Sequence, residues 1–96
     1  MKRKNDRSLG EVLSQLVDGS GMREKMDELD IRSWWDELAG SMIARHTTSL
    51  ELRRGKLFVR VDSAPLRQEL TYMRATLVEL LNKRAGREVV KEVVLQ

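Results

Sequence analysis

The sequence predicts an α+β domain in which helices precede a β-hairpin, a long amphipathic helix follows the hairpin, and a strand closes the fold. Three observations predict this class. Apolar residues recur at helical spacing before residue 48 and again from residue 66 to residue 81, they alternate with polar residues between residues 48 and 61, and β-branched residues crowd residues 88 to 95. We expect one three-stranded sheet with the helices packed against one of its faces.

The composition is typical of a small globular protein. The chain has 96 residues, of which 41% are hydrophobic and 34% are charged, so one domain with a modest core is expected. The formal net charge of +3 permits a polyanionic partner without requiring one. The sequence contains no cysteine, which excludes disulfides, thiolate metal sites and cysteine nucleophiles.

The basic start of the chain has no apolar run behind it, so it does not predict a secretory signal. No window approaches the roughly 18 apolar residues of a membrane span. We therefore expect a cytoplasmic protein, with residues 1–7 as a flexible basic arm and residues 8–96 as a single domain.

The first predicted helix begins at Ser8, with Glu11 at the spacing of a capping box. It ends at the Gly-Ser-Gly run of residues 19–21. Its apolar positions are Leu9, Val12, Leu13, Leu16 and Val17.

A second short helix is predicted over residues 22–29, and Asp30 can cap a third. Gly40 lies inside the pattern of the third helix, which indicates either a close backbone approach or a break in the helix at that residue. The apolar stripe of the third helix comprises Ile31, Trp35, Leu38 and Met42. Four methionines on the predicted apolar stripes are expected to fill gaps in the core, namely Met22, Met26, Met42 and Met73.

Two strands are predicted at residues 48–53 and 56–61, where apolar and polar side chains alternate. Arg54 and Gly55 lie between them, and Gly55 can adopt the positive φ that a tight turn requires. The pattern predicts a β-hairpin with one apolar and one polar face.

The long helix is predicted to begin at the Asp62-Ser63 cap, with Pro65 in its first turn, and to end at Gly86. Its continuous stripe comprises Leu66, Leu70, Met73, Leu77, Leu80 and Leu81. A last strand is predicted at residues 88–95. Because a helix separates it from the hairpin, this strand can pair in parallel, with either hairpin strand as its neighbour.

The hairpin carries the first candidate site. Arg53, Arg54, Lys56 and Arg60 cluster around the turn, and Phe58 shares the face of Lys56 and Arg60. Such a surface could hold phosphates and stack a base. The other interpretation is a solvated hairpin whose cations guard against edge pairing. Phe58 could also be covered by the N-terminal helices, which would remove its role in stacking.

Two further basic groups could extend this site. Arg67 and Arg74 lie on one flank of the long helix and could continue a basic track, although Glu69 and Glu79 also favour ordinary surface charge. The N-terminal arm could add sequence-independent phosphate contacts through Lys2, Arg3 and Lys4.

The two adjacent tryptophans must face different ways. Trp35 lies on the core stripe, whereas Trp34 is either a half-buried lid or a residue that contacts a partner. His46 is the only histidine and is expected to close a helix end, because it has no metal-ligand spacing or nucleophile around it. An acidic patch on the second and third helices offers either a partner surface or a solvated face, and it comprises Asp27, Glu28, Asp30, Asp36 and Glu37.

Several short motifs together resemble the DciA-like family of bacterial proteins. They are Trp-Asp-Glu-Leu-Ala-Gly at residues 35–40, Ile-Ala at 43–44, His-Thr at 46–47, Leu-Phe-Val-Arg-Val-Asp-Ser at 57–63, Leu-Arg-Gln-Glu-Leu at 66–70 and Leu-Leu-Asn-Lys-Arg-Ala-Gly at 80–86. The resemblance implies a KH-like fold, DNA binding and a role around the replicative helicase. The sequence has no Gly-x-x-Gly loop, so the clamp of a true KH domain is not carried over.

The leading hypothesis is a non-enzymatic module that binds nucleic acid, with DNA as the expected partner. The alternative is a protein adaptor that docks on the replicative helicase, or on another replication component, through Trp34 and the acidic helices. No cofactor, metal, small-molecule substrate or membrane is expected.

Overall fold

The computed structural model describes residues 21–96 and confirms the predicted α+β class. The predicted helix that begins at Ser8 and the basic arm lie outside the described residues. The elements are α2 (Met22–Ala39), α3 (Ser41–Arg45), β1 (Thr47–Arg53), β2 (Lys56–Val61), α4 (Ala64–Ala85) and β3 (Glu92–Leu95).

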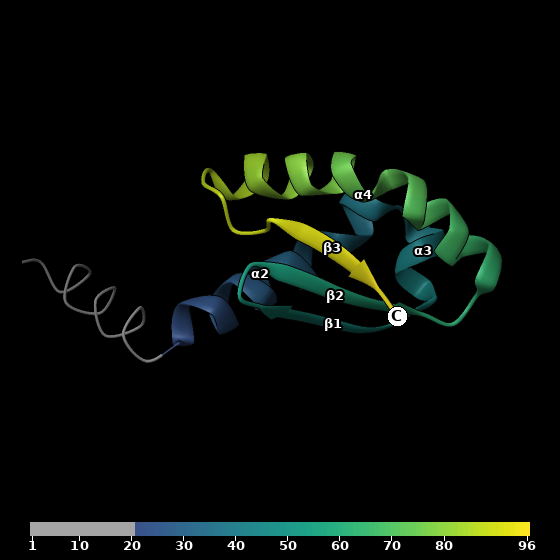
Figure 1. The fold of residues 1–96 in the computed structure, drawn as a ribbon, viewed down its shortest axis with the longest axis horizontal. Coiled ribbons are helices and arrows are strands. Elements are labelled where there is room, and N and C mark those ends of the chain that lie inside the picture. Colours follow the sequence, from purple (N-terminus) through teal and green to yellow (C-terminus); the bar gives the residue numbers. More distant parts are fainter. Residues whose placement is uncertain (1–20) are drawn as a thin grey trace, which may run out of the picture.

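The strands form one three-stranded sheet in the order β1-β2-β3. β1 and β2 form the predicted antiparallel hairpin, and β3 pairs in parallel with β2, which identifies the neighbour that the sequence left open. α4 supplies the crossover that a parallel pair needs, and it runs along the sheet on the β3 side (Figure 1).

One face of the sheet and the inner sides of the helices make the core. Leu57 and Val59 of β2 are fully buried, and Val93 of β3 lies beside Leu57 in the register. Ile31 and Leu77 bring α2 and α4 onto the same apolar layer. The alternating residues on the opposite face of the sheet are exposed or half-buried, so the strands keep one open face.

Residues 22–39 form one helix of 18 residues rather than the two short helices that the sequence predicted. Asp30 lies inside this helix and does not cap a new one, so that prediction was wrong. No glycine or proline interrupts the segment, and its residues are mostly good helix formers, so nothing local stops the helix before Gly40.

Gly40 ends α2, with φ 98° and ψ 147°, a conformation that L side chains rarely adopt. The helix break is therefore the correct one of the two predictions at this residue. The break turns α3 away from the line of α2 and leaves Met42 exposed. The expected core role is also wrong for Met22 and Met26, which are 55% and 48% exposed, whereas Met73 is half-buried against the core.

α4 begins and ends as predicted. The Ser63 hydroxyl accepts a hydrogen bond from the Leu66 amide at 3.4 Å, Pro65 lies in the first turn, and Gly86 adopts the left-handed conformation at the end. Leu70, Leu77 and Leu81 of its stripe are fully buried. Leu80 is 37% exposed, because it lies at the edge of the stripe rather than on it.

β3 is shorter than predicted, because Val89 and Val90 are buried in the loop before the strand. Asn82 of α4 organises this loop. Its Oδ1 accepts the amides of Val89 and Val90 at 2.8 and 2.9 Å, and its Nδ2 donates to the Val90 carbonyl at 2.8 Å. These bonds occupy the backbone groups that a longer strand would have used.

The outer edge of β1 is covered by side chains of α2. Arg32 donates to the Leu50 carbonyl, Glu28 accepts the Leu52 amide, and Glu24 accepts the Arg54 amide. The edge of β1 therefore offers no free row of backbone groups for another strand. At the other edge of the sheet, Val93 of β3 is 1% exposed.

Candidate nucleic-acid interface

The open face of the sheet carries cations and carboxylates together. Arg53, Lys56 and Arg60 are exposed on it, as the alternation predicted. The register places Glu51 of β1 opposite Phe58 and places Glu92 of β3 beside Lys56. The face is therefore basic near the turn but is not a continuous positive surface.

Arg53 is engaged within this face. Its guanidinium lies 4.4 Å from the centroid of the Phe58 ring and 3.5 Å from the Glu51 carboxylate. Phe58 is half-buried, and it is Arg53 rather than the N-terminal part of α2 that lies over its ring. A base could stack on Phe58 only after displacing Arg53, so the geometry does not favour this residue as a stacking platform.

The hairpin turn exposes its cationic residue. Arg54 and Gly55 have φ 53° and φ 80°, the pair of positive values that defines a type I′ turn. This turn matches the twist of the strands and leaves the Arg54 side chain at the tip of the hairpin. Among residues 21–96, the Arg54 guanidinium forms no ion pair.

Lys91 joins this turn from a distant part of the chain. Its amide donates to the Gly55 carbonyl at 2.7 Å, and its aliphatic carbons lie 3.2 Å from the position that a Cβ on Gly55 would occupy. We call Arg53, Arg54, Lys56 and Lys91 the basic turn. The sequence analysis missed Lys91, because only the parallel pairing of β3 with β2 brings it there.

The other candidate cations from the sequence analysis do not belong to the basic turn. Arg60 lies four residues beyond Lys56 on the same face of β2, about 13 Å away by strand geometry. Arg67 donates to the Val61 carbonyl at 3.0 Å and is half-buried, which favours a structural role. Lys2, Arg3 and Lys4 lie outside the described residues.

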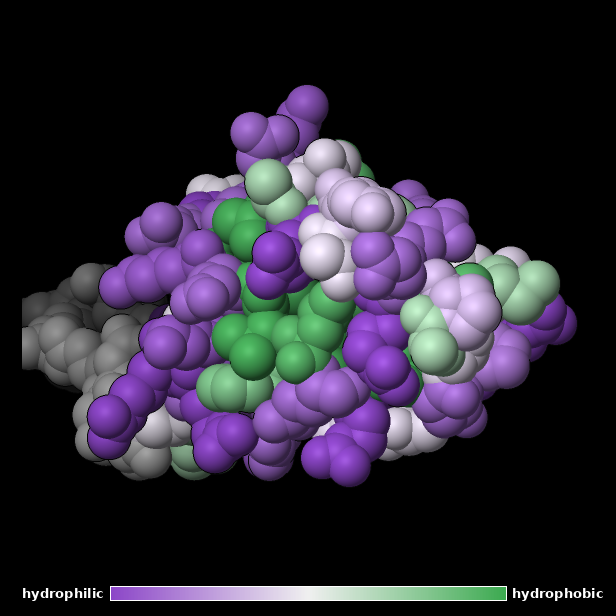
Figure 2. Space-filling view, turned by 45° about the vertical axis from the view of Figure 1, so that its right-hand side comes forward, coloured by the Kyte–Doolittle hydropathy of each residue, from purple (hydrophilic) through white to green (hydrophobic). Residues whose placement is uncertain are grey.

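Arg74 and Lys91 line one groove of about 400 Å³ between α4 and β3. The remaining lining residues are Thr71, Tyr72, Ala75, Val78, Glu92 and Val93. In the space-filling view, a hydrophobic area in the middle of the molecule is bordered by hydrophilic side chains (Figure 2). Of the predicted flank pair on the long helix, Arg74 is the member that shares a surface with the basic turn.

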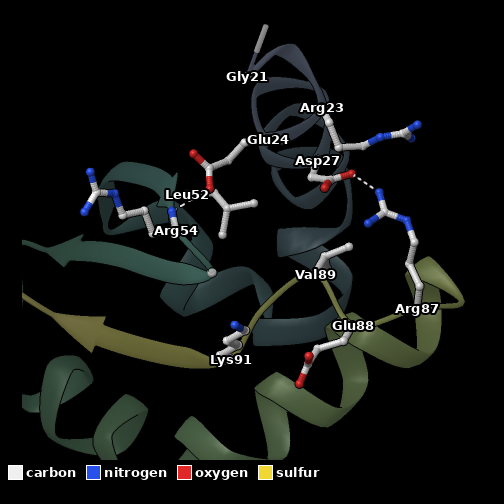
Figure 3. Close-up of a pocket in the computed structure, with 11 residues that line it drawn as sticks. Gly21, Arg23, Glu24, Asp27, Leu52, Arg54, Arg87, Glu88, Val89 and Lys91 are labelled. Carbon is white, nitrogen blue, oxygen red and sulfur yellow. Dashed lines mark hydrogen bonds and ion pairs between the residues drawn. The ribbon is translucent and has the colours of Figure 1, made fainter. Parts of the chain in front are cut away.

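On the other side of Lys91, a hollow of about 370 Å³ lies between the start of α2, the hairpin turn and the loop after α4 (Figure 3). Asp27 reaches across it to an ion pair with Arg87, and Glu24 accepts the Arg54 amide. Asp27 and Glu28 are 9% and 4% exposed, so these two do not belong to a surface acidic patch. They are buried because they tie α2 to the loop and to β1.

Trp34 is half-buried and packs against the core, with the Arg84 guanidinium 5.7 Å from its ring. Arg84 also pairs with Glu37, so this group joins α2 to α4. The arrangement favours the lid over the partner contact. Trp35 is in the core as predicted, with Nε1 donating to the Thr47 hydroxyl at 3.0 Å.

His46 follows α3, and its Nδ1 lies 2.8 Å from the Asp62 carboxylate. In the described part of the chain, no group of three or more His, Cys, Asp or Glu side chains is placed to hold a metal ion. None of the described helices combines the length and apolar composition needed to cross a membrane.

These features define a small α+β fold that places exposed cations at the hairpin turn and along a groove beside α4. A family model described as "Dna[CI] antecedent, DciA" matches residues 8–95. The chain belongs to the DciA family.

Two curated relatives illustrate this membership. The chain is 28% identical over 86 residues to a UPF0232 protein of Corynebacterium glutamicum (strain R), which covers 90% of this chain and 48% of the relative. It is 25% identical over 75 residues to a UPF0232 protein of Bifidobacterium longum (strain NCC 2705), covering 78% of this chain and 48% of the relative. The chain thus spans about half the length of these relatives. No solved structure matches it, and the KH-like fold stays a prediction.

Proposed function

We propose that this chain is a non-enzymatic, replication-associated module that binds DNA through the phosphate backbone. One observation carries the proposal. Four exposed cations lie at the hairpin turn and in the adjoining groove, and within residues 21–96 none of them forms an ion pair: Arg54, Lys56, Arg74 and Lys91.

The proposed mechanism is electrostatic. Lysine and arginine side chains that neutralise phosphates release condensed counterions, and this release supplies sequence-independent affinity. Some cations elsewhere in the described part of the chain are paired with carboxylates, as in Arg87 with Asp27 and Arg84 with Glu37, whereas Arg45, Arg60 and Lys83 form no ion pair there. Paired cations gain less from a phosphate, since they must first leave a partner.

A charge-neutralising pair of variants tests the site. Lys56→Gln/Lys91→Gln removes two cations of the basic turn, whereas the control Arg45→Gln/Lys83→Gln removes two exposed cations from α3 and from the end of α4. Fluorescence anisotropy with a labelled oligonucleotide in about 50 mM salt should show a loss of affinity of about tenfold for the first variant and a much smaller loss for the control.

Both variants change the net charge equally, so a difference between them reports position rather than total charge. Thermal melts followed by circular dichroism should show that both remain folded. Equal losses in the two variants would mean that the basic turn is not the binding surface.

A second function is supported by family membership. The resemblance implies work around the replicative helicase, and the chain would then be an adaptor that docks on that helicase. The lid position of Trp34 gives no support to this residue as the docking contact.

Pull-down of purified replicative helicase by the tagged chain, with and without nuclease, separates the two functions. Capture that persists after nuclease treatment supports the adaptor. Capture that disappears shows that DNA bridged the two proteins.

A further inference from the structure

Tyr72 presents an aromatic ring to solvent on α4. It is 78% exposed, the largest exposed fraction among the large hydrophobic residues between positions 21 and 96, and its hydroxyl accepts a hydrogen bond from the Gln68 amide at 2.9 Å. Neither the core nor a cationic side chain of the described residues covers the ring. A ring so exposed contributes little to folding, because most of its apolar area remains in water.

The other aromatic residues are already occupied. The chain has two tryptophans, one tyrosine and one phenylalanine, and all four lie in the described residues. Trp35 is in the core, the guanidinium of Arg84 lies over Trp34, and that of Arg53 lies over Phe58. Tyr72 is therefore the aromatic residue whose ring is available to a ligand.

Tyr72 lines the same groove as Arg74 and Lys91. Ala75, Val78 and Val93 give the groove an apolar floor, whereas the two cations provide positive charge at its walls. Glu92 is the one carboxylate among the lining residues, and Lys56 lies beside it in the sheet register. An exposed ring beside cations and an apolar floor is the combination that holds a flat, apolar group joined to an anion.

We infer that this groove binds a single-stranded nucleic acid, with one base stacked on Tyr72 and the neighbouring phosphates beside Arg74 and Lys91. This inference rests on the proposed function and adds to it the form of the nucleic acid. Bases in a duplex are stacked on one another and cannot reach a protein ring, whereas bases in a single strand can. Because Lys91 belongs both to the groove and to the basic turn, one strand can follow both surfaces.

The test compares two oligonucleotides and three variants. A labelled 12-nucleotide thymidine strand reports single-strand binding, and a blunt duplex of the same length reports duplex binding. Tyr72→Ala should weaken binding of the single strand about tenfold, since it removes the ring on which one base stacks, and should leave duplex affinity within about twofold.

Tyr72→Phe keeps the ring and should bind the single strand as the parent does. Leu29→Ala is the matched control, because Leu29 is an exposed apolar residue, 59% exposed, on α2 and outside the groove. It should change neither affinity. Since Tyr72 is largely in water, melting temperatures of all three variants should remain close to that of the parent.

The outcomes distinguish this inference from the proposal on which it rests. If the parent chain binds neither oligonucleotide, the proposed function is wrong. If the parent binds both but Tyr72→Ala binds the single strand equally well, the inference is overturned and the basic turn stands. An equal loss of affinity for the single strand and the duplex in Tyr72→Ala also overturns it. The inference is likewise overturned if a 12-residue polyglutamate peptide binds with the same affinity as the single strand and with the same dependence on Tyr72.

Discussion

The carboxylate of Glu28 is buried against the edge of the sheet. Burial raises the pKa of this group, but the hydrogen bond from the Leu52 amide, the hydrogen bond from Arg32 and the charges of Lys25 and Arg32 outweigh it. The pKa of Glu28 is therefore held below its ordinary value of 4.5. A carboxyl whose pKa is lower in the folded chain stabilises the fold when it is ionised.

We predict a pH-dependent contribution from Glu28. Its stabilisation is fully present above about pH 4.5, the unfolded value, and is lost as the pH falls through the lower folded value. The free energy of unfolding of Glu28→Gln should be about 1 to 2 kcal/mol lower than that of the parent at pH 7, because the charge-assisted hydrogen bonds become neutral ones. Urea unfolding at pH 7 and pH 3 measures the difference, and a gap that does not shrink at pH 3 would contradict the prediction.

Arg54 occupies the first central position of a type I′ turn, where a non-glycine residue with positive φ is strained. Asparagine tolerates this conformation better than arginine does, and Asn-Gly is the preferred pair for the turn. The amide of residue 54 would keep its bond to Glu24, because that bond uses the backbone.

Arg54→Asn should therefore have opposite effects on folding and binding. We expect the free energy of unfolding to rise by about 0.5 kcal/mol, from relief of backbone strain. Oligonucleotide affinity should fall, since one cation of the basic turn is lost. Thermal melts and anisotropy on the same sample measure both, and a fall in stability would show that the Arg54 side chain supports the hairpin.

At the scale of elements, the connection from α4 to β3 depends on a single side chain. Asn82 satisfies the amides of Val89 and Val90 and the carbonyl of Val90, in a loop whose valines are 8% and 0% exposed. Water has little access to these backbone groups. The loop also sets where β3 begins, and with it the position of Lys91.

Asn82→Ala should lower the free energy of unfolding by about 2 to 4 kcal/mol, because buried backbone groups lose their partners. Lys83→Ala, one residue further along α4 and exposed, is the control and should change stability by less than about 0.5 kcal/mol. Urea unfolding compares the two. Similar values for both variants would show that the loop finds other partners.

At the scale of the whole molecule, ion pairs are unevenly distributed among the charged side chains. Carboxylates of α2 bind the hairpin edge and the loop after α4, and they neutralise Arg32 and Arg87 in doing so. Arg53 of the basic turn pairs with Glu51, but Arg54, Lys56, Arg74 and Lys91 form no ion pair within the described residues. A small net charge of +3 therefore coexists with a concentrated basic surface.

We predict a steep salt dependence of oligonucleotide binding. If four cations each neutralise one phosphate of a single strand, the logarithm of the association constant should fall against the logarithm of salt concentration with a slope of about −3. Lys56→Gln/Lys91→Gln should reduce the magnitude of that slope by about 1.4. Anisotropy titrations between about 50 and 200 mM salt measure it, and an unchanged slope would place the phosphate contacts elsewhere.

Much of the fold was predictable because its signals are local. The hairpin, its turn, the cap at Ser63 and the end of α4 at Gly86 depend on residues that are close in sequence. The prediction of two helices in place of α2 was wrong. Asp30 has a side chain suited to a helix cap, but no glycine or proline before it ends the preceding helix. The alternation of polar and apolar residues identified the cations of the hairpin, but it did not predict which of them form ion pairs.

The sequence by itself determined the order of elements, the open polar face of the hairpin and the absence of thiol chemistry, since periodicity and composition do not depend on folding partners. Only the tertiary structure decided which charged side chains are buried or paired and which are exposed without an ion pair. It buried Asp27 and Glu28, placed Arg53 over Phe58, and brought Lys91 to Gly55. Those outcomes depend on contacts between residues far apart in the chain, and the parallel pairing of β3 with β2 is what brings Lys91 to the hairpin turn.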